Sequence, residues 1–547
     1  MTSMRNKTVG QELAPDKQPT SAWSPLGYPA FAMLWFATIL SNIGTWMHDV
    51  GAGWLMTELA PSPIMVAMVQ SATTLPVFLL ALIAGSIADI VDRRKLLIVL
   101  NVFMATVAAV LSSFVVLGWM TPTALLIFTF LLGTGAAFMA PAWQAIVPSL
   151  VPRPHLSAAI ALNSTGINVS RAIGPALAGF LIVAVGLWSP FALNAISFLG
   201  IIAALLWWRA PASVQGSLPP ERVGPAVIAG LRFAWHSPAL RSTLVRSFAF
   251  FLFASALWAM LPLIAKDQLS GGAALYGLLL TSVGAGAVAG ALVLPKLKKS
   301  FSPSILVAIG TVGIALVLAI FATVSDARLA VAAAAIAGAS WIMVLSSLNV
   351  SAQTALPNWV RARGLSIFLT VFFGAMSAGS LVWGQIASLT SIPTSLLIAA
   401  SGAVALIPLT WRARLNQGED LNHSPSMHWP APILAEVDPK DRGPVMIQLT
   451  YTVDRDNADE FQRLMDKLAA ARRRNGAYGW SLMQAAEDPM TFVETWYEAS
   501  WLNHLRHHER VTESERTLQT RVWALLKDEA KPQVAHYLAP SDQTEKN

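Results

Sequence analysis

Few charged residues interrupt the long apolar stretches of this sequence, and these few could carry chemistry. Asp49, with His48 beside it, and Arg171 lie in stretches that are otherwise nearly free of charge. A charged side chain near the centre of a bilayer is costly unless it has a partner or a role. Asp49, and less strongly His48, are therefore candidate proton carriers, unless Asp49 lies near enough to the membrane surface to be hydrated. Arg171 could serve substrate or coupling, or could tie helices together through backbone carbonyls.

Neutral polar residues form a second candidate set in the same stretches. Their amide groups could line a substrate cavity or could simply pair neighbouring helices. They are Asn42, Asn168, Asn194, Asn349 and Gln353.

Membrane-spanning helices are the elements that must position these residues. The chain has 547 residues, of which 55% are hydrophobic and 12% charged. About 20 apolar residues cross a bilayer core, and twelve such stretches follow one another between Phe31 and Trp411. The apolar run after the polar first 28 residues is too long for a cleaved signal, so we expect it to be retained. The absence of cysteine excludes disulfides and thiolate metal sites.

The predicted fold class is an all-α membrane protein of twelve helices in two six-helix bundles, followed by an α+β ferredoxin-like domain. In that last region apolar residues alternate from Val445 to Val453, and the predicted order of elements is βαββαβ. The predicted segments are a tail at 1–28, bundles at 29–208 and 241–411, a central loop at 209–240, a linker at 412–443, the small domain at 444–540 and a tail at 541–547.

The Lys and Arg residues of short loops predict the orientation. Basic residues such as Arg93, Lys95 and Lys298 concentrate on one side of the membrane, whereas the other side offers Lys266 and Arg328. The basic side is normally cytoplasmic, so we expect a multi-pass protein of the cell (inner) membrane with both termini and the C-terminal domain in the cytoplasm. The net charge of +7 then reflects loops at the lipid bilayer, and no nucleic-acid partner is expected.

A loop motif lies between the second and third predicted helices. It reads Gly85-Ser-Ile-Ala-Asp89-Ile-Val-Asp92-Arg93-Arg94-Lys95. It resembles the motif Gly-x-x-x-Asp-[Arg/Lys]-x-Gly-[Arg/Lys]-[Arg/Lys] of the major facilitator superfamily, with Ile90 in place of a basic residue and Asp92 in place of the turn glycine. The resemblance implies that Gly85, Asp89, Arg93 and Arg94 form a latch between the two halves; a positive-inside cluster is the alternative for the basic residues.

The fifth predicted helix contains Gly174, Pro175 and Gly179. The run is similar to a Gly-Pro-x-x-Gly-Gly element of exporting members of the superfamily. A proline kinks a membrane helix and glycines allow close packing, so this helix could seal a pathway or only pack. The buried arginine that the family carries in its fourth helix has no counterpart here, so the proton relay of the drug antiporters is not implied.

The C-terminal region adds a second resemblance, on the run from Glu494 to Thr512. It is similar to the third strand and second helix of antibiotic-biosynthesis-monooxygenase-type domains, and the whole chain resembles the transmembrane secretion effector or enterobactin-exporter-like branch of the superfamily. His504 and His508 stand four residues apart and could share a metal. Without a His-Glu-x-x-His motif, and with basic neighbours, a packed or solvated helix face is favoured, so neither a metal nor a cofactor is expected.

These observations favour a secondary active transporter, not an enzyme. The resemblance implies proton-coupled efflux of a small organic molecule (a drug, siderophore or secondary metabolite) by alternating access. There is no Gly-x-x-x-x-Gly-Lys-[Ser/Thr] motif for ATP. The alternative is that the C-terminal domain is a membrane-tethered, cofactor-free monooxygenase-like enzyme, with Trp496 and His504 in its pocket, or a ligand-sensing module. Such a domain could also pair two chains as a homodimer.

Overall fold

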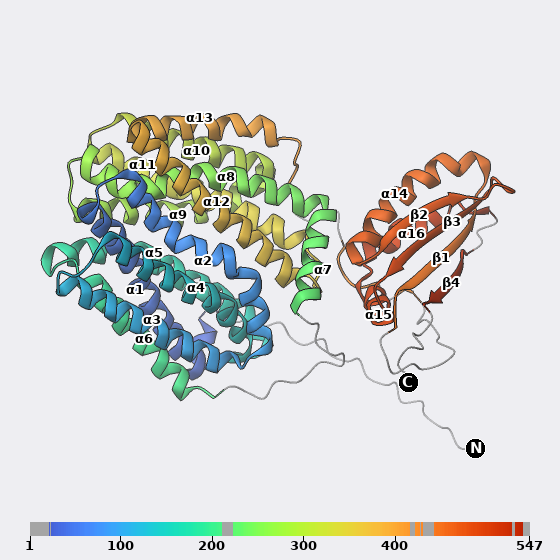
Figure 1. The fold of residues 1–547 in the computed structure, drawn as a ribbon, viewed down its shortest axis with the longest axis horizontal. Coiled ribbons are helices and arrows are strands. Elements are labelled where there is room, and N and C mark those ends of the chain that lie inside the picture. The colour runs from blue at the N-terminus through green and yellow to red at the C-terminus, as the bar shows by residue number, and fades with distance from the viewer. Residues whose placement is uncertain are drawn as a thin grey trace, which may run out of the picture.

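The computed structural model consists of a large helical bundle and a smaller domain built on a sheet (Figure 1). It describes residues 21, 23–209, 223–415, 422–426, 428–429, 442–527 and 531–539. Helix α7 (Val223–His236) lies between the two six-helix sets in the chain and faces the small domain (Figure 1). Within the predicted central loop, the residue pattern from Val227 to Trp235 indicates a short amphipathic helix, and α7 confirms it.

Twelve helices in the described part of the chain are long and apolar enough to cross a membrane, which confirms the predicted fold class. Several begin with a proline directly after a serine whose side chain caps the helix, as at Ser62, Ser237 and Ser302. The bounds are α1 (Pro29–Leu59), α2 (Pro63–Ile90), α3 (Arg93–Val116), α4 (Pro122–Leu150), α5 (Leu156–Ala184), α6 (Ser189–Trp207), α8 (Pro238–Leu263), α9 (Ala273–Ser300), α10 (Pro303–Thr323), α11 (Ala327–Thr354), α12 (Arg361–Leu389) and α13 (Ile392–Thr410).

The two bundles meet along two helix pairs, α2 with α12 and α5 with α9. In the first pair the Ser71 hydroxyl donates to the Ser377 carbonyl at 2.9 Å. In the second pair a Cβ added to Gly277 would lie 2.6 Å from the Pro175 carbonyl oxygen and 3.1 Å from the Gly179 Cα. The backbones of α5 and α9 therefore touch, which requires glycine at the contact.

Helix α1 contributes to three hydrophobic clusters along its length, and two of them show how it lies between the bundles. Near its start, Phe31 and Leu34 pack in a cluster made by the first bundle alone. Further along, Met47, Val50 and Trp54 belong to the large cluster that contains most of the second bundle. Helix α1 therefore packs against the second bundle toward its C-terminal end, which lies away from α7.

The C-terminal domain has a four-stranded antiparallel sheet with the strand order β2-β3-β1-β4. The alternation predicted from Val445 onward is confirmed, because Val445, Ile447, Leu449 and Tyr451 are buried against the helices. The elements are β1 (Val445–Thr452), α14 (Ala458–Asn475), β2 (Tyr478–Gln484), β3 (Thr491–Glu498), α15 (Trp501–Arg510), α16 (Glu513–Trp523) and β4 (Gln533–Leu538).

The second helical segment of this domain is split into α15 and α16. The break falls at Val511 and Thr512, where the Thr512 hydroxyl accepts from the Glu515 amide and the Glu515 carboxylate accepts from the Thr512 amide. The sequence Thr512-x-x-Glu515 predicts this capping box, and the structure confirms it. It begins α16, so the structure has two helices between β3 and β4 where the predicted order βαββαβ has one.

The C-terminal domain contacts α7 and the loop between α11 and α12. Arg232 of α7 donates to the Gly476 carbonyl at 2.9 Å. His423, in the linker segment that pairs with residues 511–514 of the domain, bonds through its ring to the carbonyl of Thr354 at the end of α11, at 3.0 Å. The Arg510 guanidinium lies 4.2 Å from the centroid of the Trp359 ring. These contacts attach the domain to the second bundle and to its connecting helix.

Candidate functional site

One face of α1 is turned toward the second bundle. Asn42, Trp46, Asp49 and Gly53 share this face, since their spacings of three, four and seven residues match the helical repeat. A Cβ on Gly53 would lie 3.0 Å from the Tyr276 hydroxyl of α9. Asp49 also lies within electrostatic range of Tyr276. The acidic residue singled out by the sequence therefore faces the junction between the two bundles.

Arg171 of α5 reaches the same face of α1 from within the first bundle. Its guanidinium carbon lies 5.4 Å from the centroid of the Trp46 ring, close enough for a cation–π contact. Its Nε atom is buried without a hydrogen-bond partner among the described residues. No ion pair joins the described side chains of Arg171 and Asp49. A carboxyl group and a guanidinium group thus lie near the bundle junction without a direct ion pair between them.

His48 and Asn194 lie on a different side of α1, inside the first bundle. The His48 ring, 3% exposed, meets the Phe191 ring of α6 edge to face at 5.1 Å. The Asn194 side chain is buried where α6 crosses Gly44 so closely that a Cβ there would lie 2.9 Å from the Asn194 oxygen. Their positions favour helix packing over a role in the substrate pathway.

The remaining candidate Asn and Gln side chains form hydrogen bonds within their own helices. Asn168 donates to the Ser164 carbonyl of its own helix at 2.9 Å. Gln353 donates to the Asn349 side chain at 3.0 Å, and both are exposed near the end of α11. Among the polar candidates, the structure therefore places Asp49 and Arg171 at the same face of α1, on which the helical spacing also places Asn42, and leaves the others apart.

The glycines of α5 serve two neighbours. Gly174 faces α1, where an added Cβ would lie 3.1 Å from the Ile43 carbonyl oxygen, and Gly179 faces α9, where it would lie 3.0 Å from the Ala273 carbonyl oxygen. Pro175 lies inside the helix between them. The run thus packs α5 against both bundles, and its sealing role stays a prediction.

The loop motif between α2 and α3 has a geometry that explains one of its departures from the family pattern. Asp92, which replaces the turn glycine, is the N-cap of α3 and accepts from the Lys95 amide at 3.1 Å. Gly85 faces α12, where an added Cβ would lie 3.5 Å from the Ser366 hydroxyl. The side chain of Asp89, on the last turn of α2, lies outside the described residues. Arg93 begins α3.

The C-terminal domain buries a polar network that the sequence did not reveal. Glu494 of β3 accepts from the Tyr451 hydroxyl at 2.7 Å and from the Trp480 indole at 2.8 Å, with Arg472 at 3.4 Å. Two residues on, Trp496 donates to Glu498 at 3.0 Å, and its ring lies 4.4 Å from the Arg472 guanidinium carbon. Trp496 is 1% exposed, so it is a core residue and not the wall of an oxygenase pocket.

Glu498 organises the histidines of α15. Its carboxylate lies 2.6 Å from His507 Nδ1 and 3.4 Å from His504 Nδ1. Burial would raise the pKa of Glu498, but the two histidines outweigh burial and hold that pKa well below its ordinary range. Burial, with His504 and His507 nearby, lowers the pKa of His508 to about 3. Near neutral pH, Glu498 is therefore ionised and His508 is neutral.

Two six-helix bundles that meet along paired helices, with ionisable residues facing the junction, define a secondary transporter of the major facilitator type. Solved structures of this type share the fold. A POT family transporter bound to 5-aminolevulinic acid is 13% identical, with a TM-score of 0.58 over 70% of this chain and 96% of that chain. A mutant of the nucleoside transporter NupG is 14% identical, with a TM-score of 0.58 over 70% of this chain and 99% of that chain.

The chain belongs to the transmembrane secretion effector family, whose model matches residues 20–544. Similar proteins include the staphyloferrin A transporter of Staphylococcus aureus, 26% identical over 48% of this chain and 66% of that protein. The multidrug efflux pump Tap of Mycolicibacterium fortuitum is 23% identical over 67% and 91%, and the enterobactin exporter EntS of Salmonella choleraesuis is 26% identical over 59% and 76%. The family and these relatives are transporters and not enzymes, so the oxygenase alternative is not favoured.

Proposed function

We propose that this protein exports a small organic molecule, a drug, siderophore or secondary metabolite, by alternating access coupled to inward proton movement. The proposal rests on the position of Asp49, which lies on the face of α1 that faces the second bundle. Efflux is supported by the similar proteins, which include a multidrug efflux pump and an enterobactin exporter. A carboxyl at such a junction can take a proton in one conformation and release it in the other.

The orientation belongs to the same proposal. Both termini and the C-terminal domain lie in the cytoplasm of a cell whose inner membrane holds the twelve helices, since the basic loops lie on that side. Gly85, Asp89 and Arg93 form the latch that biases the outward-facing state. Arg94 instead acts inside the first bundle, because it bonds α6.

Transport assays in inverted membrane vesicles test the proposal, with a panel of fluorescent drugs and siderophores as substrates. Asp49→Asn should abolish accumulation driven by a proton gradient while downhill movement of the same substrate continues. Glu58→Gln is the matched control, because Glu58 is also an acidic residue of α1 but is exposed at the end of the helix, where it accepts a hydrogen bond from the Trp54 indole. Unchanged gradient-driven accumulation in Asp49→Asn would refute the coupling role, and transport of no panel member by wild type would refute export of these classes.

We further propose that the C-terminal domain is a ferredoxin-like module that pairs with a second copy through the outer face of its sheet. That face carries large exposed side chains, including Met483 and Tyr537, and Tyr478 stacks on Tyr497 at 5.8 Å. Sheets with such faces gain stability by burying them. Native mass spectrometry of the full chain in detergent should give a dimer that Tyr497→Asp with Tyr537→Asp converts to a monomer. A monomeric wild type would refute the pairing.

A further inference from the structure

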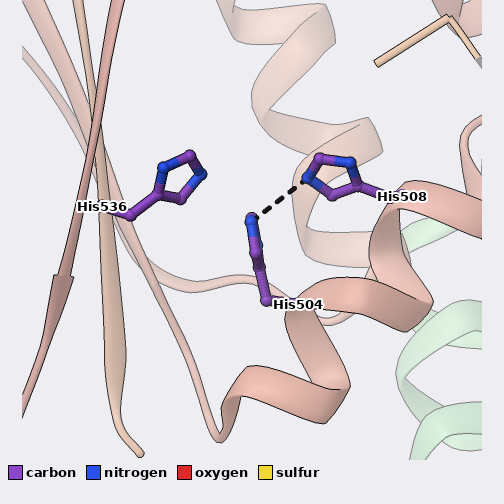
Figure 2. Close-up of side chains that lie close together, drawn as sticks. All are labelled: His504, His508 and His536. Atoms are coloured by element: carbon purple, nitrogen blue, oxygen red, sulfur yellow. Dashed lines mark hydrogen bonds between the residues drawn. The ribbon is translucent and has the colours of Figure 1, made fainter. Parts of the chain in front are cut away.

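Three histidines of the C-terminal domain come together at one point, although one of them is far from the others in the chain. His504 and His508 lie on α15 and His536 lies on β4 (Figure 2). His504 Nε2 and His508 Nε2 are 3.2 Å apart, and each histidine offers a ring nitrogen within 4.8 Å of the other two. The ring centroids of His504 and His536 are 4.8 Å apart.

The fold fixes this meeting through helix spacing and strand register. His504 and His508 are four residues apart, so they share one face of α15. His536 pairs with Ile447 of β1, which in turn pairs with Trp496 of β3. Directly paired residues point to the same side of a sheet, so His536 points to the buried, helix-covered side on which Ile447 and Trp496 lie.

Glu498 prepares His504 as a ligand. Its carboxylate faces His504 Nδ1 at 3.4 Å, which favours the proton on Nδ1 and leaves the lone pair on Nε2. That nitrogen is the one directed at His508 (Figure 2). A carboxylate behind a histidine, with the far nitrogen free, is the usual arrangement around protein-bound metals.

The spacing of the nitrogens also suits a metal ion. Zinc binds imidazole nitrogens at about 2.0–2.1 Å in tetrahedral geometry, which places two such nitrogens roughly 3.3 Å apart. The distance of 3.2 Å between His504 Nε2 and His508 Nε2 is already close to this value. The ligand nitrogen of His536 lies within 4.8 Å of the other two and has to move closer to reach this spacing; His536 is the exposed member of the three, whereas His504 is the buried one. The exposed side also gives an ion a path into the site.

We propose that His504, His508 and His536 bind one divalent transition-metal ion of the class that imidazole prefers, such as zinc, nickel or copper, with a fourth position open to water. This site is separate from the transport pathway and revises the expectation of no metal. The sequence offered only the pair on α15. The third ligand follows from the pairing of β4 with β1.

Metal retention by the full-length protein tests the site. The protein is purified in detergent with a tag that lacks histidine, incubated with zinc or cobalt, and desalted before its metal content is measured. Wild type should keep one ion per chain, and cobalt should give the visible absorption of a tetrahedral site. His508→Gln and His536→Gln should each lose most of the bound ion, whereas His236→Gln, which alters a histidine of α7, should keep it. Glu498→Gln should weaken binding roughly 10–100-fold.

Melting temperatures show whether a variant loses the metal because the site is gone or because the protein is unfolded. Zinc should raise the melting temperature of wild type, EDTA should reverse the rise, and neither should affect His536→Gln. In EDTA, wild type and His536→Gln should melt at similar temperatures. A wild type that retains no more zinc or cobalt than the His508→Gln, His536→Gln double variant would overturn the proposal and leave an ordinary hydrogen-bonded histidine pair.

Discussion

Arg94 Nε donates to the main-chain carbonyl of Leu205 at 2.7 Å, and a terminal nitrogen of the same guanidinium donates to the Leu206 carbonyl at 2.8 Å. These carbonyls belong to the last turn of α6, where no helical partner is left for them. A basic residue of the loop motif therefore caps a helix of its own bundle, and its charge also suits the negative end of that helix.

Arg94→Ala should accordingly lower stability more than it lowers transport per folded molecule. The loss of two charge-assisted bonds is expected to cost about 1.5–3 kcal/mol, visible as a lower melting temperature in detergent. Arg94→Lys, which keeps one donor group near the helix end, should recover part of it. A melting temperature equal to that of wild type in Arg94→Ala would contradict this role.

The contact between α5 and α9 should tolerate no side chain at Gly277. A Cβ there meets the backbone at Pro175 and Gly179, which cannot rotate away, so Gly277→Ala should lower both melting temperature and transport. Gly200→Ala is the matched control in a membrane helix, because nothing lies within 4 Å of the added Cβ. Equal effects of the two substitutions would show that the close approach of the helices is unimportant.

Single cysteines can establish the orientation, since the chain contains none. Ser325, between α10 and α11, and Ser300, at the end of α9, are both exposed and lie at opposite ends of the bundle. In intact cells, Ser325→Cys should react with an impermeant maleimide, and Ser300→Cys should react only after the membrane is opened. The reverse pattern would invert the proposed topology.

Docking of the C-terminal domain should weaken in acid through His423. Burial lowers the pKa of this ring, and Arg474 and Arg361 lower it further, while its bond to Thr354 and the charge of Glu515 act in the opposite direction. Because the docked state resists protonation, the undocked state binds the proton more readily as the pH falls below the ordinary histidine value. The contact is therefore complete above about pH 6.5 and is lost progressively below it.

Hydrogen–deuterium exchange at residues 354–359 measures this docking once the intrinsic pH effect is removed. Exchange should rise between about pH 7.5 and 5.5 in wild type. His423→Gln is the control, because its amide can still donate to the Thr354 carbonyl but does not titrate in this range. A rise of equal size in that variant would assign the effect to other groups.

The fold of this chain was largely readable from its sequence because length and hydropathy are enough to identify membrane helices. The alternation from Val445 and the capping box at Thr512 identified parts of the small domain in the same local way. The role of Asp92 was missed, since a family pattern directs attention to the absent glycine, although Asp is itself a common N-cap residue.

The sites were harder to predict because they depend on contacts between distant segments. In the sequence, His48 and Asn194 look like Asp49, because each is a polar side chain in an apolar helix. Only the packing of α1 against α6 shows that His48 and Asn194 lie inside the first bundle, whereas Asp49 faces the junction. His536 stands 28 residues beyond His508, and no spacing rule links a strand histidine to a helical pair before the sheet register is known.

The C-terminal domain is attached to α7 and to the loop between α11 and α12. When the second bundle tilts during transport, the domain should move with it, because these contacts hold it to that bundle and to α7. In a dimer joined through these sheets, the conformational changes of the two chains would then be coupled. The tilting of the second bundle in one chain would favour or oppose the same tilting in the other.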